Sequence, residues 1–433
     1  MYKHLKYGQQ LKTFVDRAEK MTAPLMKRID DIAEENQFRV LQAFRNNQVS
    51  DYHFTPSTGY GYDDIGRDTL EQVYAEVFGA EAAIVRSQMM SGTHAIALAL
   101  YGVLRPGDEL LYITGEPYDT LHEVIGLRGR NNGSLIDFGI RYNDVPLTEE
   151  GVDYEKVKAS INENTKVIGI QRSKGYTKRP AFTIEDIKEM TSFVKSIKED
   201  VIVFVDNCYG EFVEEKEPCH VNVDLIAGSL IKNPGGGIVK TGGYIAGRKE
   251  LVNLCAQRFS APGVGAEIGA TLYSLLEMFQ GFFLAPFIVA QALKGAIFTS
   301  AMVEQFGYEA YPKWNEKRGD LVQSVQFKNA DEMITFCQAI QYASPINAHV
   351  TPYPSEMPGY DDEVIMAAGA FIQGSSIELS ADGPIRPPYI AYVQGGLTYS
   401  HVKIAILHAL DLLAQKGYLS PFTNEQTEEI GNS

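Results

Sequence analysis

Lys232 is the residue of this chain whose surroundings best suit covalent chemistry. It lies in residues 224–237, DLIAGSLIKNPGGG, where an apolar strand at residues 225–228 is predicted to run into a glycine-rich loop. Burial at a strand end disfavours the ammonium form of a lysine and leaves a nucleophilic amine at neutral pH, as Schiff-base chemistry requires. The ordinary alternative is a strand-end lysine that reaches solvent.

Asp206 is a carboxylate at the tip of a predicted central strand. This strand, residues 201–205 (VIVFV), is apolar on both faces, as a strand in the middle of a sheet must be. A carboxylate at the end of such a strand is costly to bury without a cationic partner. We therefore expect Asp206 to face a ligand. Lys232 follows 26 residues later, after a second apolar strand.

Ser91, Gly92 and Thr93 precede an apolar helix that is predicted over residues 95–104. Small residues with hydroxyl and backbone N–H groups at a helix N-terminus make an anion site, because the free amides and the helix dipole both favour a phosphate. Ser and Thr are also ordinary N-caps, so this pattern alone leaves both interpretations open.

Two further side chains could contact a ligand. Tyr118 follows the predicted strand at residues 109–113, at the edge where open α/β sheets bind ligands, and could stack on a planar ring. Arg386 stands between turn residues in ADGPIRPP, where it could bind a carboxylate with two hydrogen bonds or merely cap the surface.

These residues need a sheet whose strand ends meet at one edge. Strands and helices alternate along the middle of the chain, which predicts an α/β fold with a mostly parallel, doubly wound sheet. The predicted strands are residues 81–86, 109–113, 135–138, 165–171, 201–205 and 225–228, with 242–246 returning along the sheet edge. The predicted helices are residues 68–78, 95–104, 154–161 and 184–197.

Helical and mixed segments flank this sheet. Apolar residues at helical spacing predict two helices within residues 9–47, with a break near Pro24, before a tyrosine- and glycine-rich loop. We expect an N-terminal arm with this loop (1–67), a large domain (68–305) and a small α+β domain (306–433). In the last two parts we expect a helical block at 266–303, helices at 330–343 and 398–415, and strands at 376–379 and 389–393.

The composition argues against several classes of protein. The chain has 433 residues and a formal net charge of -16, whereas a nucleic-acid binder needs a basic face. Its four cysteines show no disulfide or zinc-ligand spacing, so no metal site is expected. The N-terminus lacks the apolar core of a signal peptide, and Pro286 and Lys294 interrupt the apolar run at 281–298. We therefore expect a cytoplasmic protein without a membrane partner, in which this run is a buried or interface helix.

Taken together, the anion cradle, the aromatic at a strand end, the acidic strand tip and the SxxK of residues 229–232 resemble the pyridoxal-phosphate enzymes of fold type I. The chain looks most like the cystathionine lyase and methionine gamma-lyase class, in particular the carbon–sulfur lyases associated with aluminium resistance. The resemblance spans almost the whole chain. Its most specific pieces are GSLIKNPGGGIVKTGGYIAG (residues 228–247) and VQGGLTYSHVKIA (residues 393–405).

The resemblance implies a role for each candidate residue. Lys232 would bind pyridoxal 5'-phosphate as an internal aldimine, Asp206 would pair with the pyridinium nitrogen, and Tyr118 would stack on the ring. The substrate carboxylate would bind an arginine late in the chain, which favours Arg386. The phosphate would be held by Ser91, Gly92, Thr93 and Ser229.

In these lyases a tyrosine and an arginine from the neighbouring subunit also reach the phosphate. Tyr60, Tyr62 and Arg67 occupy the corresponding loop, although GYGYDDIGR departs from the family's compact tyrosine-x-arginine and leaves open which side chain acts. The resemblance therefore implies a homo-oligomer, either a dimer or a tetramer built from dimers.

The implied reaction is β- or γ-elimination from a sulfur-containing amino acid, which gives a thiol, ammonia and a keto acid. An aminotransferase or an aldolase could use the same lysine, aspartate and phosphate cradle, because fold and cofactor do not fix the reaction. A non-catalytic binding protein on this scaffold is a further alternative. A nicotinamide oxidoreductase is disfavoured, since no GxGxxG follows the first strand.

Overall fold

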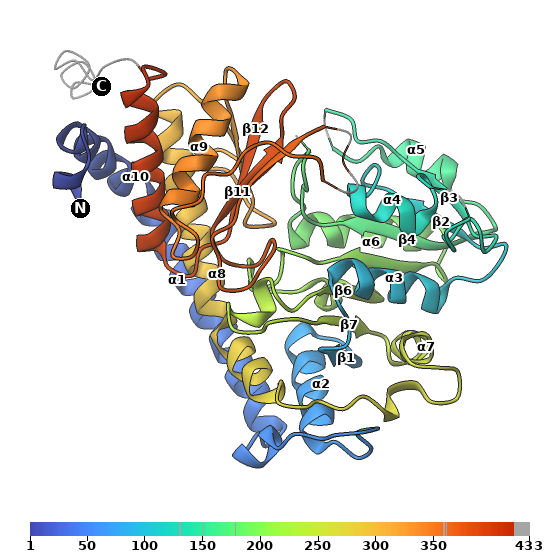
Figure 1. The fold of residues 1–433 in the computed structure, drawn as a ribbon. Helices are drawn as coiled ribbons and strands as arrows, with labels where there is room; N and C mark the ends of the chain where they lie inside the picture. Colours follow the sequence, from blue (N-terminus) through green and yellow to red (C-terminus); the bar gives the residue numbers. More distant parts are fainter. Residues whose placement is uncertain (130, 150, 178, 358–359, 361, 420–433) are drawn as a thin grey trace. The chain divides into compact units, whose positions relative to one another are not determined.

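The computed structural model describes residues 1–129, 131–149, 151–177, 179–357, 360 and 362–419. The chain divides into two compact units (Figure 1). Unit 2 comprises Ile32–Phe287 and Arg318–Asp320, and unit 1 comprises Met1–Asp31, Ile288–Lys317 and the chain from Leu321 onward. The first 31 residues therefore group with the C-terminal part of the chain, and helices α1 (Gly8–Asn46) and α8 (Leu275–Glu304) contribute residues to both units.

The described residues of unit 2 form a seven-stranded sheet with the order β1-β7-β6-β5-β4-β2-β3. The strands from β6 to β3 are parallel, and β7 runs antiparallel to both β1 and β6. This confirms the mostly parallel, doubly wound α/β sheet that the sequence predicts. The strands are β1 (Ala82–Arg86), β2 (Glu109–Tyr112), β3 (Arg141–Asp144), β4 (Thr165–Gln171), β5 (Ile202–Asp206), β6 (Leu225–Ser229) and β7 (Gly243–Gly247).

Helices cover both faces of this sheet. On one face α3 (Gly92–Val103) and α7 (Lys249–Phe259) pack against each other over strand residues such as Phe204 and Ile245 (Figure 1). On the other face Tyr244 contacts the rings of Tyr74 and Phe78 from α2 (Ile65–Phe78). The remaining helices of the unit are α4 (Asp119–Ile125), α5 (Tyr154–Ser160) and α6 (Ile184–Ile197), with 3-10 helices at Asp51–Phe54, Pro218–Val221, Asn233–Gly235 and Gly265–Glu267.

Unit 1 is built on an antiparallel sheet with the order β10-β11-β12-β9-β8. Helices α9 (Ala330–Tyr342) and α10 (Tyr399–Gln415) pack together, and their apolar residues share one core with the sheet. Leu11 and Phe14 from the first turns of α1 belong to the same core. The strands are β8 (Glu309–Tyr311), β9 (Gln323–Gln326), β10 (Val364–Ala367), β11 (Ser380–Pro384) and β12 (Ile390–Gln394), and a 3-10 helix covers Tyr2–His4.

Helix α1 is a single helix where the sequence predicts two. Pro24 lies inside it, and the chain does not break there. A proline inside a helix removes a backbone donor and crowds the preceding turn, at a cost of about 3 kcal/mol. Leu11 and Val15 before Pro24, and Val40 after it, are fully buried, so packing on both sides of the proline keeps the helix continuous.

Two predicted strands are wrong. Residues 135–138 form turns, because the Asp137 carboxylate accepts hydrogen bonds from the backbone N–H groups of Gly133 and Ser134. Residues 376–379 are irregular and precede β11, because the buried Glu378 carboxylate accepts hydrogen bonds from the Phe371 and Ile372 N–H groups and closes a loop. The strand predicted at 242–246 is confirmed as β7, but it lies between β1 and β6 and not at the sheet edge.

The apolar run at residues 281–298 lies within α8. Among the residues that the structure describes, α8 is the one helix long and apolar enough to cross a membrane by length and composition. Of its most apolar window, 72% is buried within the structure, which is typical of a core helix and matches the buried helix expected from the sequence.

Candidate active site

Asp206 and Lys232 lie at the same edge of the unit 2 sheet. Asp206 is the last residue of β5, and the adjacent parallel strand β6 ends at Ser229, three residues before Lys232. Parallel strands carry their C-terminal ends to one edge, which is where open α/β sheets bind ligands. The glycine-rich loop after Lys232 packs closely against the residues before it. A Cβ at Gly235 would meet the Leu230 carbonyl oxygen at 1.8 Å, so this close approach requires glycine.

The charges of Asp206 and Lys232 depend on each other. Burial raises the pKa of Asp206, and the Cys208 N–H group and the Lys232 ammonium only partly offset this. Burial lowers the pKa of Lys232, but Tyr209, Cys208, Tyr118 and Asp206 raise it more, and the pKa lies above its usual value. The expectation that burial leaves Lys232 as a neutral amine is therefore wrong for this structure, because acidic groups share the buried space with it.

Gly92 opens helix α3 beside these residues. A Cβ at Gly92 would meet the Cys208 sulfur and the Ser229 Cβ, each at 3.2 Å, so both residues lie against the start of the helix. Ser91 is the N-cap, and its side chain accepts a hydrogen bond from the His94 N–H group at 3.1 Å. The first amides of a helix lack partners within it, and the dipole adds partial positive charge there. The structure thus brings Gly92 and Ser229 together at the start of α3, as the predicted anion site requires.

Tyr118 is hydrogen-bonded to residues of α3 and β4. Its hydroxyl lies 2.7 Å from the hydroxyl of Thr93, and its backbone N–H donates to the Gln171 side chain at 2.8 Å. Burial raises the pKa of Tyr118, and the Asp206 carboxylate raises it further. The ring is therefore a neutral phenol at neutral pH, held beside the strand ends by α3 and β4.

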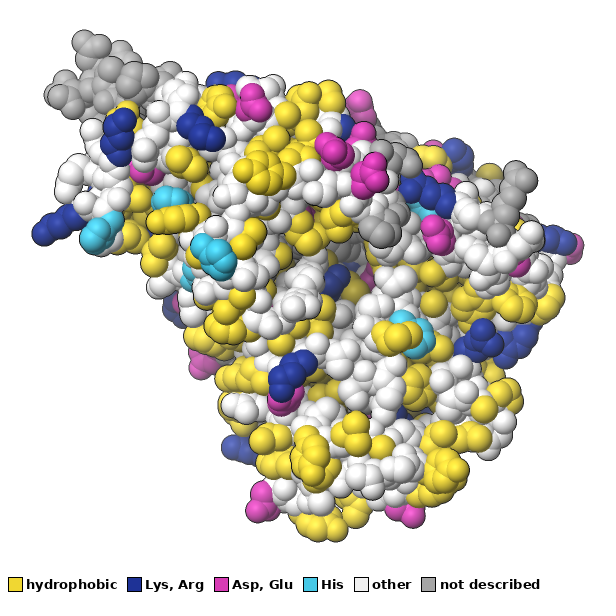
Figure 2. Space-filling view, in the orientation of Figure 1, with side chains coloured by type: hydrophobic (Ala, Val, Ile, Leu, Met, Phe, Trp, Pro, Cys, Tyr) yellow, Lys and Arg dark blue, Asp and Glu magenta, His cyan; other side chains and the backbone are white. Residues whose placement is uncertain are grey.

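Tyr60 and Tyr62 lie in the loop before α2 and Arg67 lies in the first turn of α2, and this segment is fixed within its own chain. Asp64 accepts hydrogen bonds from the Thr271 hydroxyl at 2.6 Å and from the backbone N–H of Arg67 at 2.9 Å. The Tyr60 and Tyr62 rings are 5.5 Å apart and stay 70% and 62% exposed. Figure 2 shows apolar side chains gathered at the lower end of the view, over α2 and the loop before it.

Arg67 does not share this exposure. It is 2% exposed, and its guanidinium donates to the Gly61 carbonyl at 2.6 Å and to Asp68 at 2.9 Å. The expectation that Arg67 reaches toward a neighbouring subunit is therefore not supported, because groups of its own chain, from the loop before α2 and from Gly269, enclose it. Any contact of this loop with a neighbour's phosphate stays a prediction that now depends on Tyr60 and Tyr62.

Arg386 belongs to unit 1. It follows β11, and its exposed guanidinium donates to the Asp362 carboxylate at 2.9 Å. A cation held by an exposed carboxylate can exchange that partner for another at little cost. Its role toward a substrate stays a prediction.

Sequence reasoning missed Cys208 and Tyr209 as residues of this site. The Cys208 N–H donates to the Asp206 carboxylate at 3.1 Å, and the Tyr209 ring lies against Lys232, with Nζ 3.9 Å from the ring centroid. Their position immediately after Asp206, in DNCY, was the available signal, because residues that follow a strand end share its edge.

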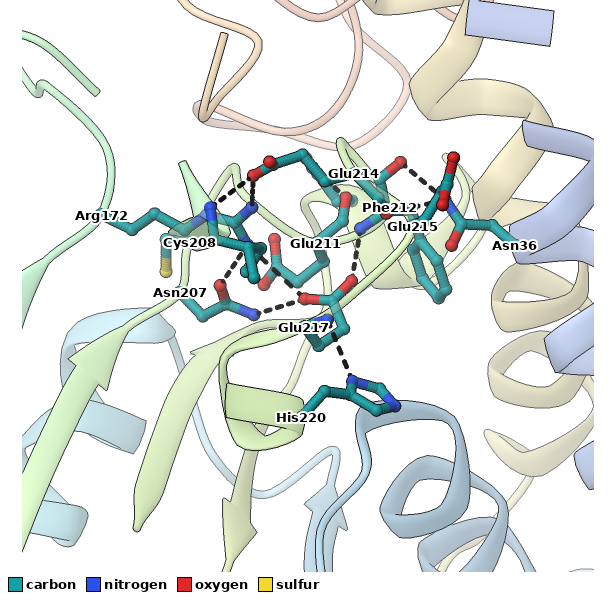
Figure 3. Close-up of polar contacts among 12 residues, drawn as sticks. Asn36, Arg172, Asn207, Cys208, Glu211, Phe212, Glu214, Glu215, Glu217 and His220 are labelled. Carbon is teal, nitrogen blue, oxygen red and sulfur yellow. Dashed lines mark hydrogen bonds and ion pairs between the residues drawn. The ribbon is translucent and has the colours of Figure 1, made fainter. Parts of the chain in front are cut away.

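A buried ionic cluster supports the chain just behind the site (Figure 3). Arg172, which follows β4, donates to the Asn207 side-chain oxygen at 2.8 Å and to Glu214 at 2.9 Å, and lies 3.6 Å from Glu217. Glu217 in turn accepts from the Asn207 amide at 3.2 Å and from the Phe212 N–H at 2.8 Å. We call Arg172, Asn207, Glu214 and Glu217 the arginine cluster.

Glu211 lies next to this cluster and is fully buried. It accepts a hydrogen bond from the Tyr244 hydroxyl at 2.7 Å. Burial raises the pKa of Glu211 to about 8, although the Tyr244 hydrogen bond lowers it in part. Glu211 is therefore a neutral carboxylic acid at pH 7.

The chain is similar to known proteins over nearly its whole length. A family profile described as Methionine gamma-lyase matches residues 11–414. A Listeria monocytogenes protein, provisionally named a cystathionine beta-lyase involved in aluminium resistance, is 62% identical with a TM-score of 0.92, covering 93% of this chain and 99% of that one. A Clostridium novyi protein, named a carbon–sulfur lyase involved in aluminium resistance, is 52% identical with a TM-score of 0.89, covering 93% and 95%.

A more distant likeness concerns the fold alone. The pyridoxal-5'-phosphate-dependent protein YhfS from Escherichia coli is 16% identical, with a TM-score of 0.60 over 88% of this chain and 96% of that one. The two proteins therefore share a fold. Because the family profile matches more than nine-tenths of the sequence, the chain belongs to the methionine gamma-lyase family.

Proposed function

We propose that this chain is a pyridoxal-phosphate-dependent carbon–sulfur lyase. It would act on a sulfur-containing amino acid by β- or γ-elimination and release a thiol, ammonia and a keto acid. The observation that supports this most is the meeting of Asp206 and Lys232 at adjacent parallel strand ends, beside the Gly92 start of α3.

The residues at this sheet edge fit pyridoxal 5'-phosphate. A Cβ at Gly92 would fill the space between Cys208 and Ser229, and a helix start without a side chain suits a phosphate, which the amides and the dipole attract. Thr93 and Ser229 add hydroxyl donors. Asp206 is a buried carboxylate suited to a protonated ring nitrogen, Tyr118 offers an aromatic face, and Lys232 offers the amine for a covalent link.

Each of these residues would then have a separate task. When bound, the cofactor supplies an electron sink for the negative charge left on the substrate after the α-proton departs. Asp206 holds a proton at the ring nitrogen, because burial makes its ionised form costly without a cationic partner. Lys232 takes the α-proton at Nζ when its amine carries no covalent link. Its raised pKa then favours holding this proton on Nζ until the proton is returned to the substrate. Tyr118 covers one face of the ring and excludes water.

Substrate binding and assembly complete the proposal. Arg386 would bind the substrate carboxylate, since a guanidinium and a carboxylate form two parallel hydrogen bonds. The enzyme would be a homo-oligomer, a dimer or a tetramer, because Tyr60, Tyr62, Leu272 and Tyr273 are exposed large side chains of the kind that symmetric self-association buries. A cytoplasmic location is supported by the four cysteines, all of which are free.

The activity is tested on the purified full-length protein with added cofactor. We expect thiol, ammonia and keto acid in equal amounts from L-cystathionine, L-methionine or another sulfur amino acid, without any keto-acid acceptor. Turnover that requires such an acceptor would identify an aminotransferase, and carbon–carbon cleavage would identify an aldolase. Either result would overturn the lyase assignment.

The cofactor link is tested separately. We expect a visible absorption band that borohydride removes, and peptide mapping after this reduction should find the pyridoxyl group on Lys232. Lys240, on the other side of the glycine turn, is the matched control, because its amine is exposed and pairs with Glu277. A pyridoxyl group on Lys240, or no visible band at all, would contradict the cofactor assignment.

A further inference from the structure

The ring of Tyr209 lies against the amine of Lys232. Nζ is 3.9 Å from the ring centroid, and both residues are half-buried at the sheet edge. A cation over an aromatic face is attracted by the ring quadrupole, and the attraction grows where water is excluded. Tyr209 has no part in the roles proposed above, yet it is the aromatic ring next to the reacting amine.

The backbone holds Tyr209 in a conformation that bulky residues rarely adopt. Its φ is 69°, in the left-handed region, and Phe212 in the same turn has a φ of 62°. Such conformations persist only where the surrounding structure determines them, and they gather at functional sites. Contacts from other segments must therefore hold this turn.

The arginine cluster holds the turn on both sides of Tyr209 (Figure 3). Before Tyr209, the Asn207 side chain bonds to Arg172 through its oxygen and to Glu217 through its nitrogen. After Tyr209, the Phe212 N–H donates to the same Glu217 carboxylate. A buried ion cluster is weak support for stability, because removing its charges from water is costly. The contacts of the arginine cluster on both sides of Tyr209 instead serve to fix the shape of this turn.

We propose that Tyr209 is a positioning residue for Lys232, whose free amine rests on the face of the Tyr209 ring. The importance of this contact for catalysis rests on the proposed function, but the contact itself does not. The contact with the Tyr209 ring also keeps the Lys232 ammonium from forming an ion pair with Asp206. The Asp206 carboxylate therefore stays available to the cofactor.

The test measures the Lys232 amine itself. Full-length protein freed of bound cofactor is labelled with trace acetic anhydride between pH 7 and pH 11, and acetylation of Lys232 is measured relative to Lys240 in the same sample by mass spectrometry. The variants are Tyr209→Phe, which keeps the ring, Tyr209→Leu, which keeps the bulk, and Tyr209→Asn. Asparagine tolerates a positive φ, so Tyr209→Asn removes the ring without adding backbone strain.

Loss of the ring should free the amine. We expect Tyr209→Leu and Tyr209→Asn to raise Lys232 acetylation at pH 8 by about tenfold relative to Lys240, with the profile shifted to lower pH, since the ring no longer stabilises the ammonium. Tyr209→Phe should stay within about twofold of the parent. If Tyr209→Leu fails to fold, Tyr209→Asn decides alone.

Two results would overturn the proposal. One is a ring-free variant whose Lys232 profile matches the parent, and the other is a Tyr209→Phe profile that matches the ring-free variants, which would assign the effect to the hydroxyl. The labelling needs neither cofactor nor turnover, so a protein without lyase activity could still show the predicted pattern. Failure of the proposed function and failure of the Tyr209 contact are therefore separate outcomes.

Discussion

Asp206 and Glu217 are two buried carboxylates of unit 2 that stand eleven residues apart and have opposite surroundings. Glu217 lies 3.6 Å from Arg172 and 3.8 Å from Arg39, and it accepts hydrogen bonds from Asn207 and Phe212. Asp206 accepts from the Cys208 N–H, but in the described part of the chain no lysine, arginine or histidine nitrogen comes within 4.0 Å of its carboxylate. Burial accordingly leaves the pKa of Asp206 raised.

The difference is the one expected between a structural carboxylate and a functional one. A buried carboxylate that has cations and donors on all sides is satisfied by the chain, and its removal leaves those partners unpaired. A buried carboxylate with an incomplete set of partners is maintained against its own burial cost, which indicates that a ligand completes the set. Glu217 fits the first description and Asp206 the second.

Asp206→Asn gives the largest expected effect and tests the functional side of this comparison. We expect the turnover number for elimination to fall by about three orders of magnitude or more, because a neutral amide cannot hold the charge that stabilises the reacting substrate. Thermal unfolding should show unchanged or higher stability, since the ionised carboxylate is costly to bury. Near-normal turnover in this variant would show that Asp206 is a structural residue, as Glu217 is.

Glu217→Gln tests the structural side. We expect a loss of about 3 kcal/mol in the free energy of unfolding, because Arg172 and Arg39 lose a shared anion inside the protein. Turnover measured below the unfolding temperature should fall far less than in Asp206→Asn. Glu215→Gln, on the exposed surface, is the control and should change stability by about 0.5 kcal/mol or less. A Glu217→Gln variant as stable as this control would contradict the assignment.

Glu211 is a third buried carboxylate of unit 2, and its contribution to stability depends on pH. Its folded-state pKa of about 8 lies above the ordinary value of 4.5, so its contribution to stability is fully present below pH 4.5 and is lost as pH rises through 8. We expect stability measured by urea unfolding to fall across this window by a few kcal/mol, and Glu211→Gln to flatten the fall, because glutamine cannot ionise. Parallel pH profiles for parent and variant would show that Glu211 does not titrate there.

The smallest expected signal concerns the exposed loop. Lys232→Ala mixed with the double variant Tyr60→Ala/Tyr62→Ala should recover up to roughly a quarter of parent activity, because hybrid dimers formed at random contain one site with all residues intact. Lys232→Ala mixed with Arg67→Ala is the matched control and should show no activity beyond that of the two variants measured separately, since the Arg67 guanidinium is hydrogen-bonded within its own chain. Absence of recovery in the first mixture, despite demonstrated subunit exchange, would remove the loop from a shared site.

The sequence predicts the parts of the site that depend on local pattern. Asp206 and Lys232 each follow an apolar run, and the alternation of strands and helices is enough to bring such run ends to one edge. The polar strand β3 escaped prediction because it lies at the sheet edge, where no apolar pattern is required.

Long-range contacts decide the rest. Nothing in DNCYGEF marks Tyr209 for a positive φ, because Arg172 and Glu217 impose that conformation from other segments. The burial of Arg67 depends on a loop around Gly269, two hundred residues further along the chain. These contacts follow from the completed fold and not from local propensity.

Unit 1 is assembled from both ends of the chain, and this constrains its biosynthesis. Leu11, Phe14 and Val15 leave the ribosome before Ile32–Phe287, and core partners such as Phe298 and Leu407 follow only after that whole segment. At synthesis rates of about 5–20 residues per second, the apolar face of the first helix waits roughly 15 to 60 seconds for Phe298 and roughly 20 to 80 seconds for Leu407. Unit 2 can form its sheet within that interval. A ribosome stalled before Ile288 would then carry the sheet of unit 2, still without Arg318–Asp320, and an N-terminal helix whose apolar face lacks its core partners.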